Sequence, residues 1–286
     1  MASLKDIRRR IGSVKKTQQI TRAMRMVAGA KLRRAQRAIE AARPYAERMR
    51  ATLSELARAQ KGVEHPLLAV RPVRRLELLV VTSDRGLCGA FNANTLKHAE
   101  RVLAERAGGL EALLVSSAGR KGHEYFRRRR PRELGAHLAL PGWVTYGQAV
   151  DLAARLAGRF AAGEVDEVVL VYSEFVSAMT QRPRDLRLLP ASTDAPEDAA
   201  EALPYEIEPS PERLLASLVP KAVEVAVYRA LLESQAGEHA ARMTAMESAT
   251  RNTEELIGSL TLQFNRARQA AITKELMEIV SGAEAL

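Results

Sequence analysis

The sequence has a single cysteine, few aromatic residues and no long hydrophobic run. The lone Cys88 excludes an internal disulfide and is typical of a protein from a reducing compartment. Aromatic residues make up 4% of the 286 residues, which favours helix contacts made by Ala, Leu and Met over a large conventional core. No apolar run approaches the roughly 20 residues of a membrane-spanning helix, so we expect no insertion into the bilayer.

Motifs for catalysis and ligand binding are also missing. The five histidines are scattered without HExxH or paired spacing, so no metal site is predicted. Gly86 and Gly89 resemble a phosphate-binding turn, but they form neither GxGxxG nor GxxxxGK[ST], which favours a plain strand-to-helix turn. Cys88 has no base at a useful spacing and is interpreted as a buried thiol. We predict no catalytic residue, no cofactor and no metal.

Both ends of the chain carry the heptad spacing of a coiled coil. Near the C-terminus, steps of three and four connect Ala236, His239, Met243, Met246, Thr250, Thr253, Ile257, Leu260, Phe264, Ala267 and Ala271. The N-terminal stripe contains Leu4, Ile7, Ile11, Val14, Leu32, Ala35, Ile39, Ala42, Ala46, Met49, Leu53 and Leu56. Between its two parts we place Ile20, Met24 and Val27 on the stripe, which requires a stutter of about one residue. We expect the two helices to pair antiparallel and to bury both stripes.

The expected helix lengths exceed any globular core. A C-terminal helix of roughly 75 residues would be about 110 Å long, and an N-terminal helix of about 55 residues roughly 80 Å. Because the C-terminal helix is longer by about 20 residues, some 30 Å of it should project without a partner. Gly29 and Pro44 lie inside the N-terminal helix, where we interpret them as tolerated points of bending or close approach.

The middle of the chain alternates strand and helix patterns. Predicted strands are Leu76–Thr82, Glu111–Ser116, Leu134–Leu140, Val165–Phe175 and a return strand within Ala178–Leu189. Predicted helices are Ala90–Ala107, Gly119–Arg130 and Thr145–Ala162. This alternation predicts a mostly parallel, Rossmann-like α/β sheet covered by helices. The segment Ala191–Glu212 holds seven acids, no base and four prolines, which indicates a flexible or extended connection.

The predicted fold class is therefore α/β, with a long antiparallel two-helix coiled coil formed by the terminal helices and an α/β domain inserted between them. Four parts are expected: the N-terminal helix 1–60, the α/β domain 73–190, the acidic linker 191–210 and the C-terminal helix 211–286.

Positive charge is concentrated at the N-terminus. Residues 1–50 hold 15 Lys and Arg against 3 Asp and Glu, a net +12, which leaves −2 of the total +10 for the other 236 residues. This basic helix face could bind nucleic acid, lie in solvent beside the coiled coil, or slide past an acidic protein surface. It contains no zinc-finger or basic-zipper arrangement, so nucleic acid is the minority interpretation.

Three separated motifs resemble the gamma chain of F-type ATP synthases. They are Ile20–Ala28 (ITRAMRMVA), Ser83–Gly89 (SDRGLCG) and Ile272–Ala283 (ITKELMEIVSGA). The resemblance covers the chain end to end, in the same order and with the same helix–α/β–helix plan. It departs from the family at Arg25, at Pro220 and in the acidic segment near 194–208.

This resemblance implies a rotor shaft that is not an enzyme by itself. The family's coiled coil inserts into a ring of three alpha and three beta chains, and its α/β domain sits with the epsilon chain on a membrane ring of c chains. Proton flow turns the c ring, and the shaft drives each beta chain through its nucleotide states, in ATP synthesis or in hydrolysis. The implied location is peripheral, on the cytoplasmic side of a bacterial inner membrane.

The resemblance also implies partner-binding residues. Arg268 and Gln269 correspond to a polar contact with a loop of the beta chain. A second set falls where the shaft meets acidic beta-chain segments: Arg22, Met24, Arg25, Lys31 and Arg33. For the lysine and arginine residues, an ordinary solvated helix face remains an equal alternative, because exposed ion pairs contribute only about 0–1 kcal/mol each.

The end of the C-terminal helix is expected to fit a hydrophobic sleeve in the ring. Its proposed bearing residues are Ile272, Leu276, Ile279 and Val280, with the small residues Ala267, Ala270 and Ala271 beside them. The alternative function is a nucleotide-binding α/β protein with coiled-coil arms. Tight binding of nucleotide by the isolated chain would favour that alternative.

Overall fold

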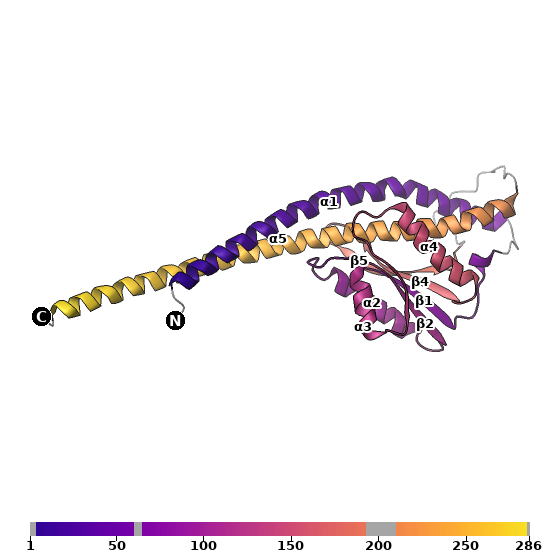
Figure 1. Ribbon diagram of the computed structural model, residues 1–286. Helices are drawn as coiled ribbons and strands as arrows, with labels where there is room; N and C mark the ends of the chain where they lie inside the picture. The colour runs from indigo at the N-terminus through magenta and orange to yellow at the C-terminus, as the bar shows by residue number, and fades with distance from the viewer. Residues whose placement is uncertain (1–3, 60–64, 193–209, 285–286) are drawn as a thin grey trace. The chain divides into compact units, whose positions relative to one another are not determined.

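The computed structural model describes residues 4–59, 65–192 and 210–284 (Figure 1). The elements, in chain order, are α1 (Leu4–Ala59), the 3₁₀ helix η1 (Pro66–Leu68), β1 (Arg75–Val81), α2 (Phe91–Arg106), β2 (Ala112–Ala118), α3 (Arg120–Arg129), β3 (Leu134–Leu138), α4 (Tyr146–Ala161), β4 (Glu167–Phe175), β5 (Gln181–Leu189) and α5 (Pro211–Glu284). The predicted fold class is confirmed: two long terminal helices in contact flank a mixed five-stranded α/β sheet.

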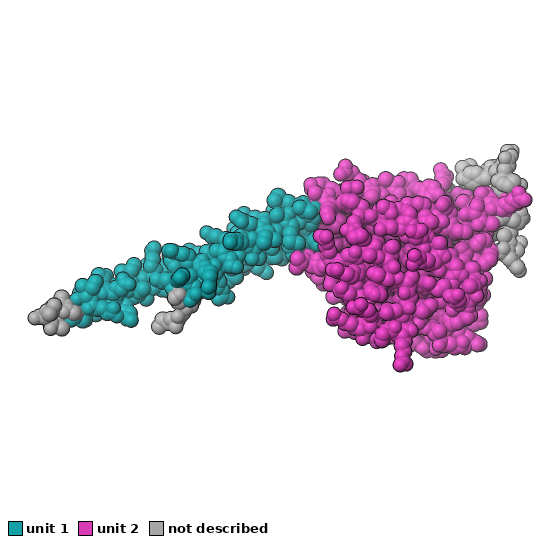
Figure 2. Space-filling view, viewed as in Figure 1, with its two compact units in different colours: residues 1–29, 242–286 teal, residues 30–241 magenta. Residues whose placement is uncertain are grey.

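The chain divides into two compact units (Figure 2). Unit 1 consists of residues 1–29 and 242–286, and unit 2 of residues 30–241. The four-part division predicted from the sequence remains a prediction. Most of its acidic linker lies outside the described residues, because the structure describes nothing between 192 and 210.

Unit 1 is an antiparallel coiled coil. The hydroxyl groups of Thr21 and Thr250 form a hydrogen bond with their oxygens 2.8 Å apart, and the Arg8 guanidinium lies 5.5 Å from the centre of the Phe264 ring. Residue numbers therefore increase along α5 in the direction in which they decrease along α1, so the two helices are antiparallel. The stripe predicted on α5 is confirmed here, since its residues from Met246 to Ala271 are buried or half-buried.

The predicted stutter in α1 is wrong. Ile20 and Val27 are 59% and 56% exposed, while Thr21 and Ala28 are buried. The heptad runs without interruption through Val14, Gln18, Thr21, Arg25 and Ala28, none of which is fully exposed. The misplacement arose because the prediction chose the most hydrophobic residues, whereas the two buried positions of this segment are occupied by Thr21 and Ala28.

Gly29 lies beside the Met243 side chain in unit 1. A Cβ atom at this position would lie 3.4 Å from the Met243 sulfur, which is ordinary van der Waals contact. An alanine would therefore also fit here, and the packing does not require a glycine. Pro44 and Pro220 also lie within continuous helices, as the sequence suggested.

The sheet of unit 2 has the strand order β3-β2-β1-β4-β5. The first four strands are parallel and β5 pairs antiparallel with β4, which confirms the expected mostly parallel sheet with a return strand. The central strands are nearly continuous apolar runs because helices cover both faces.

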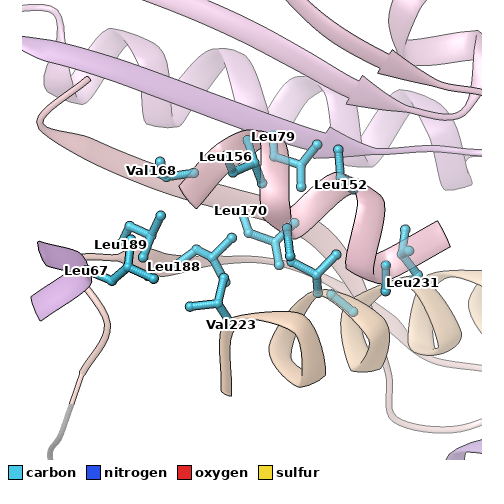
Figure 3. Packing of buried hydrophobic residues seen from close by; sticks show 14 of the residues in the cluster. Leu67, Leu79, Leu152, Leu156, Val168, Leu170, Leu188, Leu189, Val223 and Leu231 are labelled. Atoms are coloured by element: carbon cyan, nitrogen blue, oxygen red, sulfur yellow. The ribbon is translucent and has the colours of Figure 1, made fainter. Parts of the chain in front are cut away.

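Each face of the sheet has its own hydrophobic core. On one face, Leu96 and Val102 of α2 and Phe126 of α3 pack on Leu78 and Val80 of β1. The other face carries α4, parts of α1 and α5, and η1 (Figure 3). In this second core the labelled leucines and valines of β1, β4 and β5 meet those of α4 and α5. The helix pair of unit 2 is thus part of the core of the α/β domain.

Two acidic residues, Asp166 and Glu77, are buried in the sheet domain and held by hydrogen bonds. Asp166, before β4, accepts hydrogen bonds from the backbone N–H groups of Arg74 and Arg75 and pairs with the Arg75 guanidinium at 2.8 Å. The Arg75 side chain is the main reason that the pKa of Asp166 lies below its usual value. Glu77, fully buried in β1, accepts hydrogen bonds from Arg159 of α4 and from the Ser116 hydroxyl of β2.

Replacing Glu77 with Gln should destabilise unit 2. The substitution removes the only carboxylate that the described residues place against the Arg159 guanidinium, whose side chain is 22% exposed, and we expect a loss of about 2–4 kcal/mol. The measurement is urea unfolding followed by the fluorescence of Trp143, the single tryptophan. Glu111→Gln is the matched control, because the Arg74–Glu111 pair is mostly exposed and should contribute less than about 1 kcal/mol. Equal stability of both variants would contradict the prediction.

A disulfide should form between cysteines placed at Thr21 and Thr250. Their hydroxyl oxygens are 2.8 Å apart, so the two side chains meet directly across the helix pair, as the side chains of a disulfide bridge must. Mild oxidation and non-reducing electrophoresis, followed by mass spectrometry, would detect the link within one molecule. Gln19→Cys combined with Thr250→Cys is the control, since Gln19 is exposed and two residues away from the contact. Efficient linking of the control pair and none of Thr21–Thr250 would refute the helix register.

Candidate partner-binding surface

The C-terminal end of α5 presents an uncovered apolar face. Residues 272–281 are all exposed in unit 1, and helical spacing brings Ile272, Leu276, Ile279 and Val280 to one side of the helix. Their exposed fractions run from 49% to 68%. A contiguous apolar face of this kind is typical of a protein-binding site. The structure therefore places the four predicted bearing residues together.

Arg268 and Gln269 lie just before this apolar face and are both exposed. Arg268 is four residues before Ile272, so the two side chains are neighbours on the surface of one helix. Ala267 and Ala271 are half-buried and belong to the coiled-coil stripe. Arg268 lies at the edge of that stripe, and Gln269 lies on the opposite side of α5. Both polar side chains are exposed and therefore available to a partner.

The predicted basic set on α1 does not form one patch. At 100° per residue, Arg22 and Arg33 share one face of the helix, while Met24 and Lys31 share another. Arg25 lies on the coiled-coil stripe, where its guanidinium pairs with Glu247 of α5 at 3.2 Å. Of the set, Arg22, Lys31 and Arg33 are exposed, and Met24 is half-buried.

An exposed apolar stripe on α1 was missed by the sequence reasoning. Ile20, Ala23 and Val27 follow one another at helical spacing on the face opposite the coiled-coil contact, and all three are exposed. Met26, nearby, is 65% exposed. An uninterrupted heptad count from Val14 would have found this stripe, because it places these hydrophobic residues outside the helix pair.

The α5 helix packs against the point where the strand order of the sheet reverses. In α/β folds this point lies beyond the carboxyl ends of the two central strands, here β1 and β4, and is the usual place for a nucleotide. A Cβ added to Gly237 of α5 would lie 3.2 Å from a Phe91 ring carbon and 3.4 Å from Gln181 Cγ. It would also lie 3.6 Å from the Ser173 hydroxyl of β4. Protein side chains therefore pack closely around Gly237 at this point.

The loop after β1 is held by its own side chains. The Asp84 carboxylate accepts hydrogen bonds from the backbone N–H groups of Arg120 and Leu140 at 2.7 and 3.0 Å. Ser83 N–H donates to Asn92, whose amide also donates to the Cys88 sulfur. A carboxylate in this loop opposes phosphate binding, and Cys88 is buried, as expected. The loop is therefore a structural turn.

No group of three or more potential metal ligands occurs among residues 4–59, 65–192 and 210–284. Within the same residues, no helix is both long enough and apolar enough to cross a membrane. His239 is buried on the α5 stripe with its ring 5.8 Å from that of Trp143, in an edge-to-face arrangement. Its burial agrees with the place of His239 in the heptad spacing of the C-terminal helix.

Comparison with known proteins identifies the family. The family model described as ATP synthase matches residues 3–286. The ATP synthase gamma chains of Anaeromyxobacter sp. (strain Fw109-5) and Desulforamulus reducens are 53% and 50% identical to this chain, each over the whole length of both proteins.

Solved structures agree with these relatives. A chain from the central stalk and c-ring of Tetrahymena thermophila mitochondrial ATP synthase is 26% identical, with a TM-score of 0.64 over 80% of this chain and 99% of that one. A chain from Euglena gracilis mitochondrial ATP synthase shares the fold at 18% identity, with a TM-score of 0.68 over 99% of this chain and 94% of that one. The protein therefore belongs to the ATP synthase gamma chain family, the central-stalk rotor subunits that have no catalytic activity by themselves.

Proposed function

We propose that this chain couples proton flow through a membrane ring of c chains to the conformational cycle of a catalytic ring of alpha and beta chains. The observation that carries the proposal is the architecture of α5, whose end emerges from a helix pair as a single exposed helix. The Tetrahymena relative comes from a central stalk with its c-ring, and the Euglena relative from a structure with F1 and a c-ring. Both support contacts at the two ends of this rotor.

The coiled coil suits the transmission of torque. A single helix twists easily. When two helices are joined by side-chain contacts along their length, twisting the pair must deform those contacts, so the pair resists twisting more strongly. The Thr21–Thr250 hydrogen bond and the Arg25–Glu247 ion pair add specific links to the apolar stripe of unit 1. We propose that these contacts let rotation of the α/β domain be transmitted to the ring of alpha and beta chains with little loss of torque.

The remaining partners and the location follow from the same proposal. The α/β domain would contact the epsilon chain and the c ring, and the coiled coil would contact alpha and beta chains. No nucleic acid is involved. The relatives are bacterial, and the described helices do not span a membrane, so we propose a peripheral position on the cytoplasmic side of the inner membrane.

The exposed end of α5 would act as a bearing. Ile272, Leu276, Ile279 and Val280 present only aliphatic surface, which is attracted to an apolar sleeve without a directional preference. Hydrogen bonds and ion pairs would instead hold the shaft at particular angles. An apolar contact therefore permits rotation while keeping the axis centred.

Deleting Ser281–Leu286 should leave assembly intact and keep ATP hydrolysis within about twofold of the wild-type rate. The deletion spares the four bearing residues and the paired helices, to which the proposal assigns the contacts with the ring. The measurements are subunit stoichiometry after size-exclusion chromatography and ATPase turnover of the rebuilt complex. Loss of assembly would show that the end of α5 is a structural lock and would contradict the bearing proposal.

Arg268 and Gln269 would hold the shaft at one angle. Arginine supplies five N–H donors in a planar fork, and glutamine adds donors and an acceptor, so together they can bind a beta-chain loop in one rotational state. A contact made in one state alone biases the cycle toward that state. The exposed residues Arg22, Lys31 and Arg33 would add weaker, salt-sensitive attraction to acidic beta-chain segments. Met24 and the paired Arg25 would belong to the same contact region.

Replacing Arg268 and Gln269 together with Ala should slow ATP synthesis and hydrolysis about 5- to 150-fold, the range of a 1–3 kcal/mol coupling between states. Both side chains are exposed, so the isolated chain should lose little stability. ATPase turnover of the rebuilt complex is measured, with subunit stoichiometry as the check on assembly. Lys274→Ala is the control, because its side chain is also exposed and lies on the same helix but pairs with Glu278. Wild-type turnover in a correctly assembled double variant would refute the assigned role.

A further inference from the structure

Two histidines that are far apart in the sequence meet in unit 2. The rings of His123, in the first turn of α3, and His137, in β3, stack with their centres 4.2 Å apart and their planes 23° apart. Both residues are half-buried. Neither α3 nor β3 carries any of the residues that we assign to partner binding, so this contact is a separate feature of the α/β domain.

The stack connects α3 to the edge strand of the sheet. β3 pairs with β2 alone, its five residues are all half-buried, and its register with β2 shifts between Val115 and Ser117. On the face covered by α2 and α3, Leu134 packs against the core and His137 contacts His123. Nδ1 of the His137 ring also lies 3.1 Å from the Ser117 hydroxyl of β2. The two rings therefore help to hold the edge strand in place.

This arrangement favours neutral rings. Two protonated imidazole rings at this distance would place like charges about 4 Å apart, where they repel each other even near a protein surface. The pKa of His123 already lies below its usual value, chiefly because of burial and then because of His137 and Arg127. The one carboxylate that acts in the opposite direction on this pKa is Glu124, the next residue of α3.

The carboxylates on the surrounding elements are already engaged. Glu124 pairs with Lys121 at 3.1 Å and with Arg120 at 3.5 Å. Asp84, in the loop after β1, accepts hydrogen bonds from backbone N–H groups at the start of α3 and just after β3. On α2, Glu100 pairs with the arginine that ends α3. A second positive charge on the stacked rings would therefore gain little compensation from these groups.

We propose that the stack of His123 on His137 is an acid-sensitive clasp between α3 and β3. When both rings are protonated, they separate, α3 loses its contact with the edge strand, and β3 loosens while the central strands stay paired. With neutral rings, or with one proton on the pair, the clasp stays closed.

The sign of the pH dependence follows from the lowered pKa of His123. In the unfolded chain a histidine titrates at about pH 6.5, and in the folded chain His123 binds its proton at a lower pH. Between these two values the unfolded chain binds more protons. The contribution of the clasp to stability is therefore complete above about pH 7.5 and is lost as the pH falls below about 6.5.

The test is an NMR titration of the full chain from about pH 8 to about pH 5, combined with amide hydrogen exchange. Each of the two rings should show two titration steps, because the first proton on the pair opposes the second. Over the same range, the exchange protection of the β3 amides should fall at least about tenfold more than that of the β1 amides. This comparison needs only the wild-type chain.

Two substitutions separate protonation from packing. His123→Phe keeps an aromatic ring against His137 but cannot bind a proton, so it should leave a single titration step and remove the acid-dependent loss of β3 protection. His98→Phe is the control, because His98 of α2 pairs with Asp185 of β5, at the opposite edge of the sheet. It should keep the two titration steps and the loss of β3 protection.

Three results would overturn the proposal: a single independent step for each ring, β3 protection that falls no more than that of β1, or the same acid-dependent loss in His123→Phe. The last result would assign the loss to groups other than the histidine pair. If His123→Phe did not fold, the wild-type comparison of β3 with β1 would still decide. Because the test uses the isolated chain, its failure would leave the proposed rotor function untouched.

Discussion

The structure depends on one kind of contact, the packing of α1 against α5, which occurs within each of the two units. Helices as long as these are stabilised chiefly by burying one face, and each supplies the face that the other needs. In unit 1 each of the two helices packs only against the other. In unit 2 the pair also closes one face of the sheet, where Leu215 and Leu231 join the core. The same stripe therefore builds a shaft in one unit and part of a globular core in the other.

Small and polar residues, and not only large apolar ones, form the contact between α1 and α5 in unit 1. Thr21 and Thr250 meet through their hydroxyl groups, and Gly29 receives the Met243 side chain. A uniformly large apolar stripe would bury more area but would also hold the helix backbones farther apart. The close contact leaves Ile20 and Val27 on the outside, where a hydrophobic stripe faces solvent in the isolated chain. The end of α5 shows the same arrangement, since its apolar residues also lack a partner within the chain.

Much of the fold could be predicted from the sequence because its signals are local and repeated. The α5 stripe follows heptad spacing over many turns, and the strands of the α/β domain are short apolar runs bounded by turn residues. The stripe of α1 was misplaced between Val14 and Leu32 because the most hydrophobic residues of this segment are not the ones that contact α5. Thr21 is buried, whereas Val27 is exposed. Spacing alone would have found the correct register.

The functional surfaces were less predictable. The four exposed apolar residues Ile272, Leu276, Ile279 and Val280 lie within about two and a half turns of one helix, so their common side follows from spacing. The basic residues of α1 were grouped by a resemblance to the family, and the structure distributes them over different faces. No sequence signal indicated that Gly237 packs against Phe91 where the strand order reverses, or that Glu233 keeps a buried oxygen without a hydrogen-bond partner among the described residues. These features depend on contacts between residues far apart in the chain.

Direct observation of rotation tests the central claim. A gold nanorod is attached to a cysteine introduced at Lys97, an exposed position of α2, while Cys88 is buried and should stay unlabelled. The complex is rebuilt with alpha and beta chains, fixed to a surface through the ring and supplied with ATP. The account predicts that the rod turns in one direction with three pauses per revolution, matching the threefold ring. A rod that stays at a fixed angle while ATP is hydrolysed would contradict it.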